Sequence, residues 1–226
     1  MDGTTERIET VVIGGGQAGL AAGYHLAERG RPFVILDADT RIGESWRNRW
    51  DSLVLFTPAR YCGLPGSRFP LAGGSFPTKD DVADYLEQYA ARFELPVRTD
   101  VCVDRVTRRG DGGFLVRAGD LRIDAENVIV ATGANREARV PLLADELDPA
   151  IIQLHSSEYR RPAQLREGGV LIVGAGNSGP TSRWRSCAST RPGSPARTPD
   201  TCPFGSRRRS PDTWSSGSSG SPAFTS

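Results

Sequence analysis

A glycine-rich stretch, Gly14-Gly15-Gly16-Gln17-Ala18-Gly19, carries the clearest structural signal in this sequence of 226 residues. The short run of residues 9–13 precedes it, ends in three apolar β-branched residues and has the length and composition of a β-strand. Residues 17–29 follow with helical periodicity, which Gly30 closes. A Gly-x-Gly-x-x-Gly turn between a strand and a helix is the fingerprint of a unit that binds a dinucleotide. We therefore predict such a site at this turn.

The glycines of this turn have separate physical roles. Gly14 permits the tight turn, Gly16 lets a diphosphate approach the backbone without a Cβ in the way, and Gly19 lets the helix lie close to the strand. The start of the helix, at Gln17 and Ala18, then faces the negative charge of the phosphates.

A second apolar run, residues 33–36, ends at Asp37. This carboxylate stands about 20 residues after the glycines, where it can accept hydrogen bonds from the hydroxyls of a nucleotide ribose. Two strands joined by one helix normally form a right-handed parallel crossover. The sequence therefore predicts an α/β fold with a Rossmann-like, parallel sheet.

The segment up to residue 131 is expected to complete this domain. Thr78 and Asp81 have the spacing of a helix N-cap and its capping box. The apolar residues behind them recur on one helical face, which we expect to cover the sheet; they are Val82, Tyr85, Leu86, Tyr89 and Phe93. Apolar runs separated by Gly and Asp predict a β-meander of short strands, at residues 101–106, 114–117, 121–123 and 128–130.

The same pattern occurs a second time. Residues 170–173 read as a buried strand, and Gly174-Ala175-Gly176-Asn177-Ser178-Gly179 follows them. The repeat predicts a second dinucleotide site, with contacts from Gly174, Gly176, Asn177, Ser178 and Gly179. Two such sites indicate electron transfer between two cofactors. The alternative is a glycine-rich turn without function, because no amphipathic helix follows it.

Composition excludes several other classes of function. The 28 Lys and Arg residues nearly balance 27 Asp and Glu residues, so the net charge of +1 indicates neither a nucleic acid nor a membrane surface as partner. The four cysteines are too widely spaced for a disulfide framework or a metal cluster; they are Cys62, Cys102, Cys187 and Cys202. No apolar run approaches the roughly 20 residues of a membrane span, and we expect a cytoplasmic protein.

Residues 8–179 resemble flavoproteins with two dinucleotide-binding domains, most closely the flavin-containing monooxygenases and their Baeyer–Villiger-type relatives. The resemblance implies an FAD site at the first glycine turn and Asp37. Gly43-Glu44-Ser45-Trp46-Arg47 resembles the segment that runs along the flavin, which brings Trp46 and Arg47 into the predicted site, although a surface turn is the alternative. Ala131-Thr132-Gly133 resembles the motif where the chain passes the FAD, which adds Thr132 and Gly133.

His155-Ser156-Ser157-Glu158-Tyr159 resembles the linker of this family that couples domain geometry to nicotinamide binding. The monooxygenase signature is only partly met, since Pro149 and Ile151 replace its Phe and Gly while His155 and Tyr159 are in register. A solvated loop is the alternative for this segment.

The resemblance implies that NADPH, or NADH, reduces FAD, and that dioxygen then reacts with the reduced flavin. One oxygen atom would pass from a C4a-peroxyflavin to a small organic substrate, with no particular catalytic side chain identified. Two alternatives remain: a pyridine nucleotide-disulfide reductase, which needs a cysteine pair beside the flavin, and a non-catalytic FAD-binding remnant.

The last part of the chain has a different composition. Residues 180–226 include 12 Ser and 7 Pro but no Val, Ile, Leu or Met, so they predict a disordered tail. Reading each codon one base earlier would convert Trp184 to Leu, Val or Met and would permit an amphipathic helix. We therefore predict a frameshift after Gly179. The expected domains are residues 1–145 for FAD, 146–179 for the linker and the start of an NAD(P) domain, and 180–226 for the tail.

Overall fold

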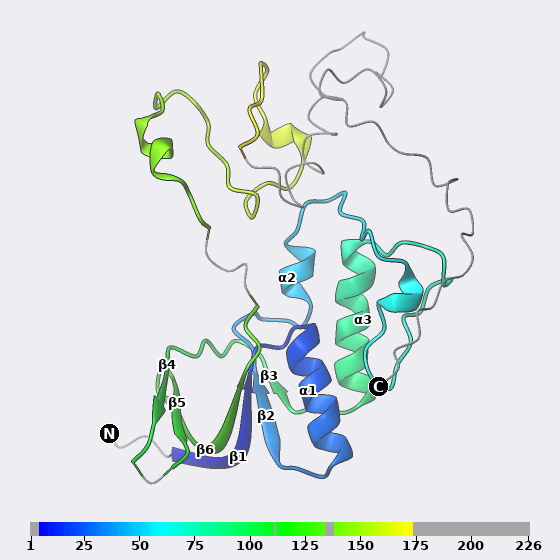
Figure 1. The fold of residues 1–226 in the computed structure, drawn as a ribbon, viewed down its shortest axis with the longest axis vertical. Helices are drawn as coiled ribbons and strands as arrows, with labels where there is room; N and C mark the ends of the chain where they lie inside the picture. Colours follow the sequence, from blue (N-terminus) through cyan, green and yellow to red (C-terminus); the bar gives the residue numbers. More distant parts are fainter. Residues whose placement is uncertain (1–4, 111, 134–137, 174–226) are drawn as a thin grey trace, which may run out of the picture. The chain divides into compact units, whose positions relative to one another are not determined.

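The computed structural model describes residues 5–110, 112–133 and 138–173. The chain divides into two compact units, residues 1–167 and 168–226. The predictions for the second glycine turn and for the tail lie outside the described residues. The first unit is built on a six-stranded sheet with the order β3-β2-β1-β6-β5-β4 (Figure 1).

The elements follow the alternation that the sequence predicts. The strands are β1 (Thr5–Ile13), β2 (Phe33–Leu36), β3 (Val97–Arg98), β4 (Arg105–Arg108), β5 (Phe114–Ala118) and β6 (Leu121–Val130). The α-helices are α1 (Gln17–Glu28), α2 (Glu44–Arg47) and α3 (Lys79–Arg92). Three short 3-10 helices complete the set: η1 (Ala59–Tyr61), η2 (Leu142–Glu146) and η3 (Pro162–Gln164).

The sheet is parallel around its centre and antiparallel at one edge. β1 pairs in parallel with both β2 and β6, and β3 pairs in parallel with β2. β5 pairs antiparallel with both β6 and β4. Val11 and Val12 of β1 have no exposed surface, as expected for a central parallel strand that is covered on both faces. These observations confirm the α/β class and the Rossmann-like sheet.

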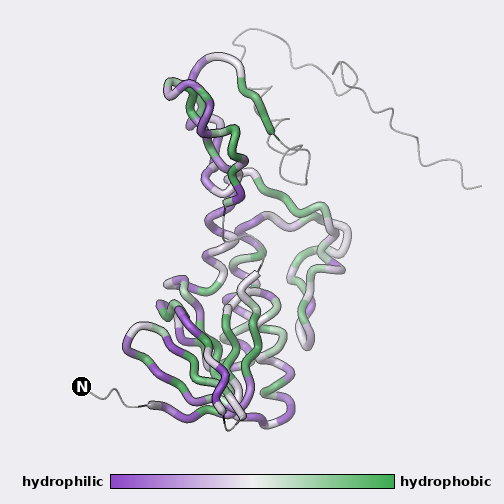
Figure 2. Tube along the Cα trace, turned by 60° about the vertical axis from the view of Figure 1, so that its left-hand side comes forward, coloured by the Kyte–Doolittle hydropathy of each residue, from purple (hydrophilic) through white to green (hydrophobic). Residues whose placement is uncertain are grey.

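Hydrophobic side chains pack on both faces of this sheet. On one face Val12 and Ile35 join residues of α1 and α3, among them Leu20 and Leu86, in one core. On the other face Val11 and residues of β2, β5 and β6 form a second core. Figure 2 shows hydrophobic residues along the central strands. The two cores hold the sheet in place, and with it the carboxyl end of β1, where the glycine turn begins.

The strand boundaries differ from the prediction in two places. Residues 121–123 and 128–130 belong to one continuous strand, β6, because residues 122–130 pair with β1 and residues 121–125 also pair with β5. Asp124 is tolerated inside it, since its carboxylate lies 2.6 Å from the guanidinium of Arg109. The strand predicted at 101–106 begins only at Arg105, where pairing with β5 starts.

The prediction of a buried strand at residues 170–173 is wrong for this structure. These residues form no strand, and Leu171 and Val173 are 88% and 68% exposed. A parallel strand depends on hydrogen bonds from a neighbouring strand. None pairs with residues 170–173 in the described part of the chain.

Helix α3 confirms the prediction made for its start and its buried face. The Thr78 hydroxyl accepts a hydrogen bond from the Asp81 N–H, and the Asp81 carboxylate accepts one from the Thr78 N–H, which completes the capping box. Tyr85, Leu86 and Tyr89 are at most 4% exposed. Helix α3 thus packs beside α1, as Figure 1 shows.

Tyr89 makes the stability of this core sensitive to alkaline pH. Its hydroxyl donates to the Pro65 carbonyl at 2.6 Å, and burial raises its pKa from about 10 to about 12. The unfolded chain loses this proton first, so stability falls as pH rises from about 10 to about 12. We expect a loss of about 2–3 kcal/mol in that interval. The free energy of unfolding of Tyr89→Phe, measured from pH 8 to 12, should lack this component; an identical pH profile would contradict it.

Candidate dinucleotide-binding site

The glycine turn begins where β1 ends. The Gly14 N–H donates to the Leu36 carbonyl at 2.7 Å, and Gly14 has a φ of +110°, which favours glycine. A Cβ on Gly14 would lie 2.5 Å from the Ala131 carbonyl oxygen. Gly14 is therefore required both by its conformation and by the close approach of the chain that leaves β6.

Gly16 and Gly19 differ sharply in what surrounds them. A Cβ on Gly19 would lie 1.8 Å from the Gly14 carbonyl oxygen, so Gly19 is required for α1 to pack against the turn. A Cβ on Gly16 would meet nothing within 4 Å. The space beside Gly16 is therefore open to a bound group.

The N-terminus of α1 is prepared for an anion. Gly16 is its N-cap and supplies no side chain to accept a hydrogen bond from the first turn, and that turn holds no acidic residue. The N–H groups at the start of a helix have no partner within the helix and carry a partial positive charge. Those of Gln17 and Ala18 stand at this end, as predicted, and the arrangement suits a diphosphate.

Asp37, which directly follows β2, holds the glycine turn through hydrogen bonds. Its carboxylate accepts hydrogen bonds from the N–H of Gly15 and, at 2.9 Å, from the N–H of Asp39. The residue is 7% exposed. A carboxylate can accept about four hydrogen bonds, so it retains capacity for a ribose hydroxyl. The sequence analysis did not assign a role to Gly15, where a Cβ would lie 2.5 Å from the Asp37 carboxylate.

Replacing Asp37 should therefore damage both the turn and its binding capacity. Asp37→Ala leaves two N–H groups without their acceptor, and we expect it to lower the free energy of unfolding by about 2–4 kcal/mol. Asp37→Asn keeps one carbonyl acceptor and should lose about half as much. Chemical denaturation of the three proteins checks this order; equal stability of Asp37→Ala and the unaltered chain would contradict it.

Helix α2 brings the predicted flavin segment to the same place. Trp46 Nε1 lies 3.4 Å from Gln17 Oε1, at the first residue of α1. Gly43 begins this segment with a φ of +83°, and a Cβ there would lie 2.7 Å from the Ala83 carbonyl of α3. The segment is thus held between α3 and the glycine turn.

Arg47 is held by protein groups on α3 and at the start of α2. Its guanidinium donates to the Ile42 carbonyl at 2.7 Å, to Asp84 at 2.9 Å and to Glu87 at 3.1 Å. Arg41 also pairs with Glu87, and that hydrogen bond is the main reason why the pKa of Glu87 lies below its ordinary value. In this structure Arg47 joins α2 to α3.

Substitution of Arg47 tests this contact. Arg47→Lys cannot reach three acceptors in different directions, because one ammonium replaces a planar fork of donors. We expect a loss of about 1–3 kcal/mol in the free energy of unfolding. Arg68→Lys, at an exposed loop position, is the matched control and should leave stability within about 0.5 kcal/mol. A loss no larger than that of the control would show that the contacts of Arg47 contribute nothing.

The segment after β6 also lies at the turn. The Ala131 N–H donates to the Ile13 carbonyl at 2.8 Å, which extends the pairing of β6 with β1 up to Gly14. The position of a Cβ on Gly14 is 3.2 Å from the Thr132 nitrogen, and Gly133 has a φ of +74°. The structure therefore brings Thr132 to the first glycine turn, with Gly133 next in the chain.

The predicted linker residues form a local network. His155 Nδ1 lies 2.8 Å from Ser157 Oγ, and the His155 N–H donates to Glu158 at 2.7 Å. Tyr159 is 8% exposed. A backbone hydrogen bond of 2.8 Å from Asp51 to Arg160 joins this segment to the chain that follows α2.

The pattern of a known family, described as pyridine nucleotide-disulphide oxidoreductase, matches residues 11–181. The chain belongs to this family. An uncharacterized CzcO-like oxidoreductase of Geobacillus kaustophilus (strain HTA426) is 45% identical over 172 residues, which cover 76% of this chain and 49% of that protein. Indole-3-pyruvate monooxygenase YUCCA1 of Oryza sativa subsp. japonica is 37% identical over 182 residues, covering 77% and 45%.

A solved structure agrees with these relatives. A mutant of a flavin monooxygenase from Stenotrophomonas maltophilia has a TM-score of 0.75 and 39% identity. The match covers 81% of this chain and 55% of that protein. The chain thus spans about half the length of the relatives that it matches, which are named as an oxidoreductase, a monooxygenase and a flavin monooxygenase.

The residues of the first turn fit the FAD of this oxidoreductase family. The α1 N-terminus offers donors to a diphosphate, the missing Cβ of Gly16 leaves room beside it, and Asp37 offers acceptors. Within the described residues no three His, Cys, Asp or Glu side chains are grouped so as to hold a metal ion. The helices there include none with the length and apolarity that a membrane span needs.

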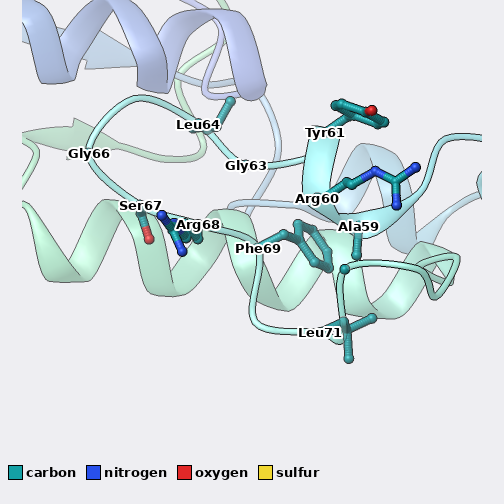
Figure 3. Close-up of a pocket in the computed structure, with 11 residues that line it drawn as sticks. Ala59, Arg60, Tyr61, Gly63, Leu64, Gly66, Ser67, Arg68, Phe69 and Leu71 are labelled. Atoms are coloured by element: carbon teal, nitrogen blue, oxygen red, sulfur yellow. The ribbon is translucent and has the colours of Figure 1, made fainter.

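A separate cavity of about 820 Å³ lies in the loop formed by residues 59–73 (Figure 3). Arg60 stacks on Tyr61 at its rim, with its guanidinium carbon 4.9 Å from the ring centre. Nearby Cys62 is half-buried, and burial raises the pKa of its thiol. A raised pKa makes this cysteine a poor nucleophile.

Proposed function

We propose that this chain forms the FAD-binding part of an NAD(P)H-dependent oxidoreductase of the flavin monooxygenase type. One observation carries the proposal. The space beside Gly16, at the N-terminus of α1, is open to a ligand, and the Asp37 carboxylate lies at the end of the neighbouring strand β2. The identity of 39% to a solved flavin monooxygenase supports the same assignment.

The chain's own residues would bind and orient the cofactor. The N–H groups of Gln17 and Ala18 hold the diphosphate, and Asp37 accepts from the adenosine ribose. Trp46 and Thr132 border the remaining part, because both lie at the turn. When bound, FAD supplies the chemistry of accepting a hydride from NADPH or NADH and passing electrons to dioxygen. The second glycine turn, at Gly174–Gly179, and His155 with Tyr159 are proposed to serve the nicotinamide nucleotide.

A stepwise spectroscopic experiment tests this function. The purified chain is saturated with FAD, and NADPH is added without oxygen while the flavin absorbance is followed. A small sulfide or amine is then supplied with oxygen, and its oxidised product is measured. FAD binding followed by neither flavin reduction nor oxygenation is the result expected from the frameshift proposed below, whereas a folded chain that binds no FAD would overturn the proposed function.

We further propose that the polypeptide does not complete turnover. The composition changes after Gly179, and the family match ends two residues later, at residue 181. This agreement supports a frameshift at that position. Determining the coding DNA for residues 177–182 tests the proposed frameshift. Coupled NADPH oxidation and oxygenation at rates typical of enzymes would overturn the proposed inactivity.

A disulfide reductase is the less supported alternative. Its chemistry requires two cysteines beside the flavin, and the described residues contain Cys62, which is half-buried, and Cys102, which is exposed. Both have free thiols. No observation on the described residues favours this function over an oxygenase.

A further inference from the structure

Lys79 is a buried charged residue that the proposed function does not use. It is the only lysine among the 28 Lys and Arg residues of the chain, and it is 8% exposed at the first position of α3. A buried ammonium is costly unless acceptors surround it. Its Nζ donates to the Arg47 carbonyl at 3.1 Å and to the Asp80 carboxylate at 2.8 Å. The buried charge is therefore paired.

These contacts join the start of α3 to the end of α2. Arg47 is the last residue of α2, and the carbonyls at the end of a helix have no partner within the helix. The backbone N–H of Lys79 also donates to the Leu53 carbonyl at 3.2 Å. Lys79 thus holds both the carbonyl that ends α2 and the chain that follows it.

The position of α2 depends on such contacts. A helix of four residues is too short to be stable alone, so its place in the fold is set by what anchors it. Gly43 packs against the Ala83 carbonyl at the start of the segment, and Lys79 holds its end. Between these two anchors Trp46 Nε1 lies 3.4 Å from Gln17 Oε1, at the glycine turn.

We propose that Lys79 is a positioning residue for FAD, which holds α2 so that Trp46 borders the flavin part of the cofactor. The inference rests on the proposed function. The ammonium acts through α2 and does not itself touch the cofactor. The diphosphate and the adenosine are assigned to the start of α1 and to Asp37, and the printed contacts of Lys79 involve neither. Loss of the ammonium should therefore weaken the binding of FAD but not that of ADP.

Lys79→Met tests this role, because it removes the ammonium and keeps an unbranched, flexible side chain. We expect FAD to bind about tenfold more weakly, since α2 then holds its position in only a fraction of the molecules, while the dissociation constant for ADP stays within about twofold. The melting temperature of the FAD-free chain should change little, because the Asp80 side chain is 63% exposed and remains solvated. A merely structural role would change the two affinities together or not at all.

Arg68→Met is the matched control. It also replaces a basic side chain by methionine, but at an exposed loop position. The affinities for FAD and ADP should both stay within about twofold of those of the unaltered chain.

The single lysine allows a second measurement on the unaltered chain. Labelling lysine with ¹⁵N gives a side-chain Nζ signal that belongs to Lys79 alone. FAD should slow the exchange of its N–H protons with water, because a flavin beside Trp46 holds the Arg47 carbonyl in place, whereas ADP should not. This measurement needs no variant, so it also applies if Lys79→Met does not fold.

The outcomes separate the two proposals. A folded, unaltered chain that binds no FAD would overturn both the function and the role of Lys79. If the unaltered chain binds FAD, an equal FAD affinity of Lys79→Met, or an equal loss of FAD and ADP affinity, would overturn only the role of Lys79. Proton exchange that FAD slows no more than ADP does would overturn it as well.

Discussion

Gly16→Glu should abolish FAD binding while leaving the fold intact. The backbone at Gly16 has a φ of −77°, which any residue adopts, and a Cβ there meets nothing within 4 Å. The carboxylate of the introduced glutamate, however, would lie where the diphosphate is proposed to bind. Like charges about 4 Å apart repel by several kcal/mol at a protein surface. We therefore expect FAD affinity to fall by at least about 100-fold, measured by quenching of flavin fluorescence.

The control for this prediction is Gly74→Glu. Gly74 also has open space at its Cβ, and it lies in a loop with no role in the glycine turn. Both variants should unfold within about 0.5 kcal/mol of the unaltered chain. Tight FAD binding by Gly16→Glu would show that the diphosphate lies elsewhere.

Gly19→Ala, unlike Gly16→Glu, should strongly lower the free energy of unfolding. Inside a helix, alanine is normally favoured over glycine by about 1 kcal/mol. Here the new Cβ would lie 1.8 Å from the Gly14 carbonyl oxygen, which belongs to the backbone and cannot rotate away. The cost of this clash exceeds the gain from the higher helix propensity of alanine. We therefore expect the free energy of unfolding to fall by about 3 kcal/mol or more.

Chemical denaturation of Gly19→Ala beside Gly74→Ala measures this effect. The second substitution meets no neighbouring atom and should be close to neutral. Stabilisation of Gly19→Ala would contradict the close packing of α1 against the turn. The contrast between Gly16 and Gly19 separates the glycine needed for binding from the glycine needed for folding.

Much of the fold was predictable because local patterns and tertiary contacts agree. The run of residues 33–36 became β2, and Thr78 with Asp81 became the capping box of α3. The roles of Gly14 and Gly19 also followed from spacing alone, since strand, turn and helix are adjacent in the sequence. Each of these features depends on residues close together in the chain.

Features that depend on distant residues could not be predicted. The continuity of β6 through Asp124 depends on its pairing with β1 and on Arg109. The link of Asp37 to Gly15 spans 22 residues and has no sequence signature. Arg47 was predicted beside the flavin, whereas its guanidinium contacts Asp84 and Glu87 on α3. Its part in FAD binding remains a prediction.

The most direct measurement compares FAD with riboflavin in binding to the purified chain. The two ligands share the flavin ring and the ribityl chain, and only FAD carries the diphosphate and the adenosine. Binding through the N-terminus of α1 predicts that FAD binds at least about 100-fold more tightly and that ADP competes with it. Equal affinity for the two flavins in a folded chain, or no competition by ADP, would contradict the account.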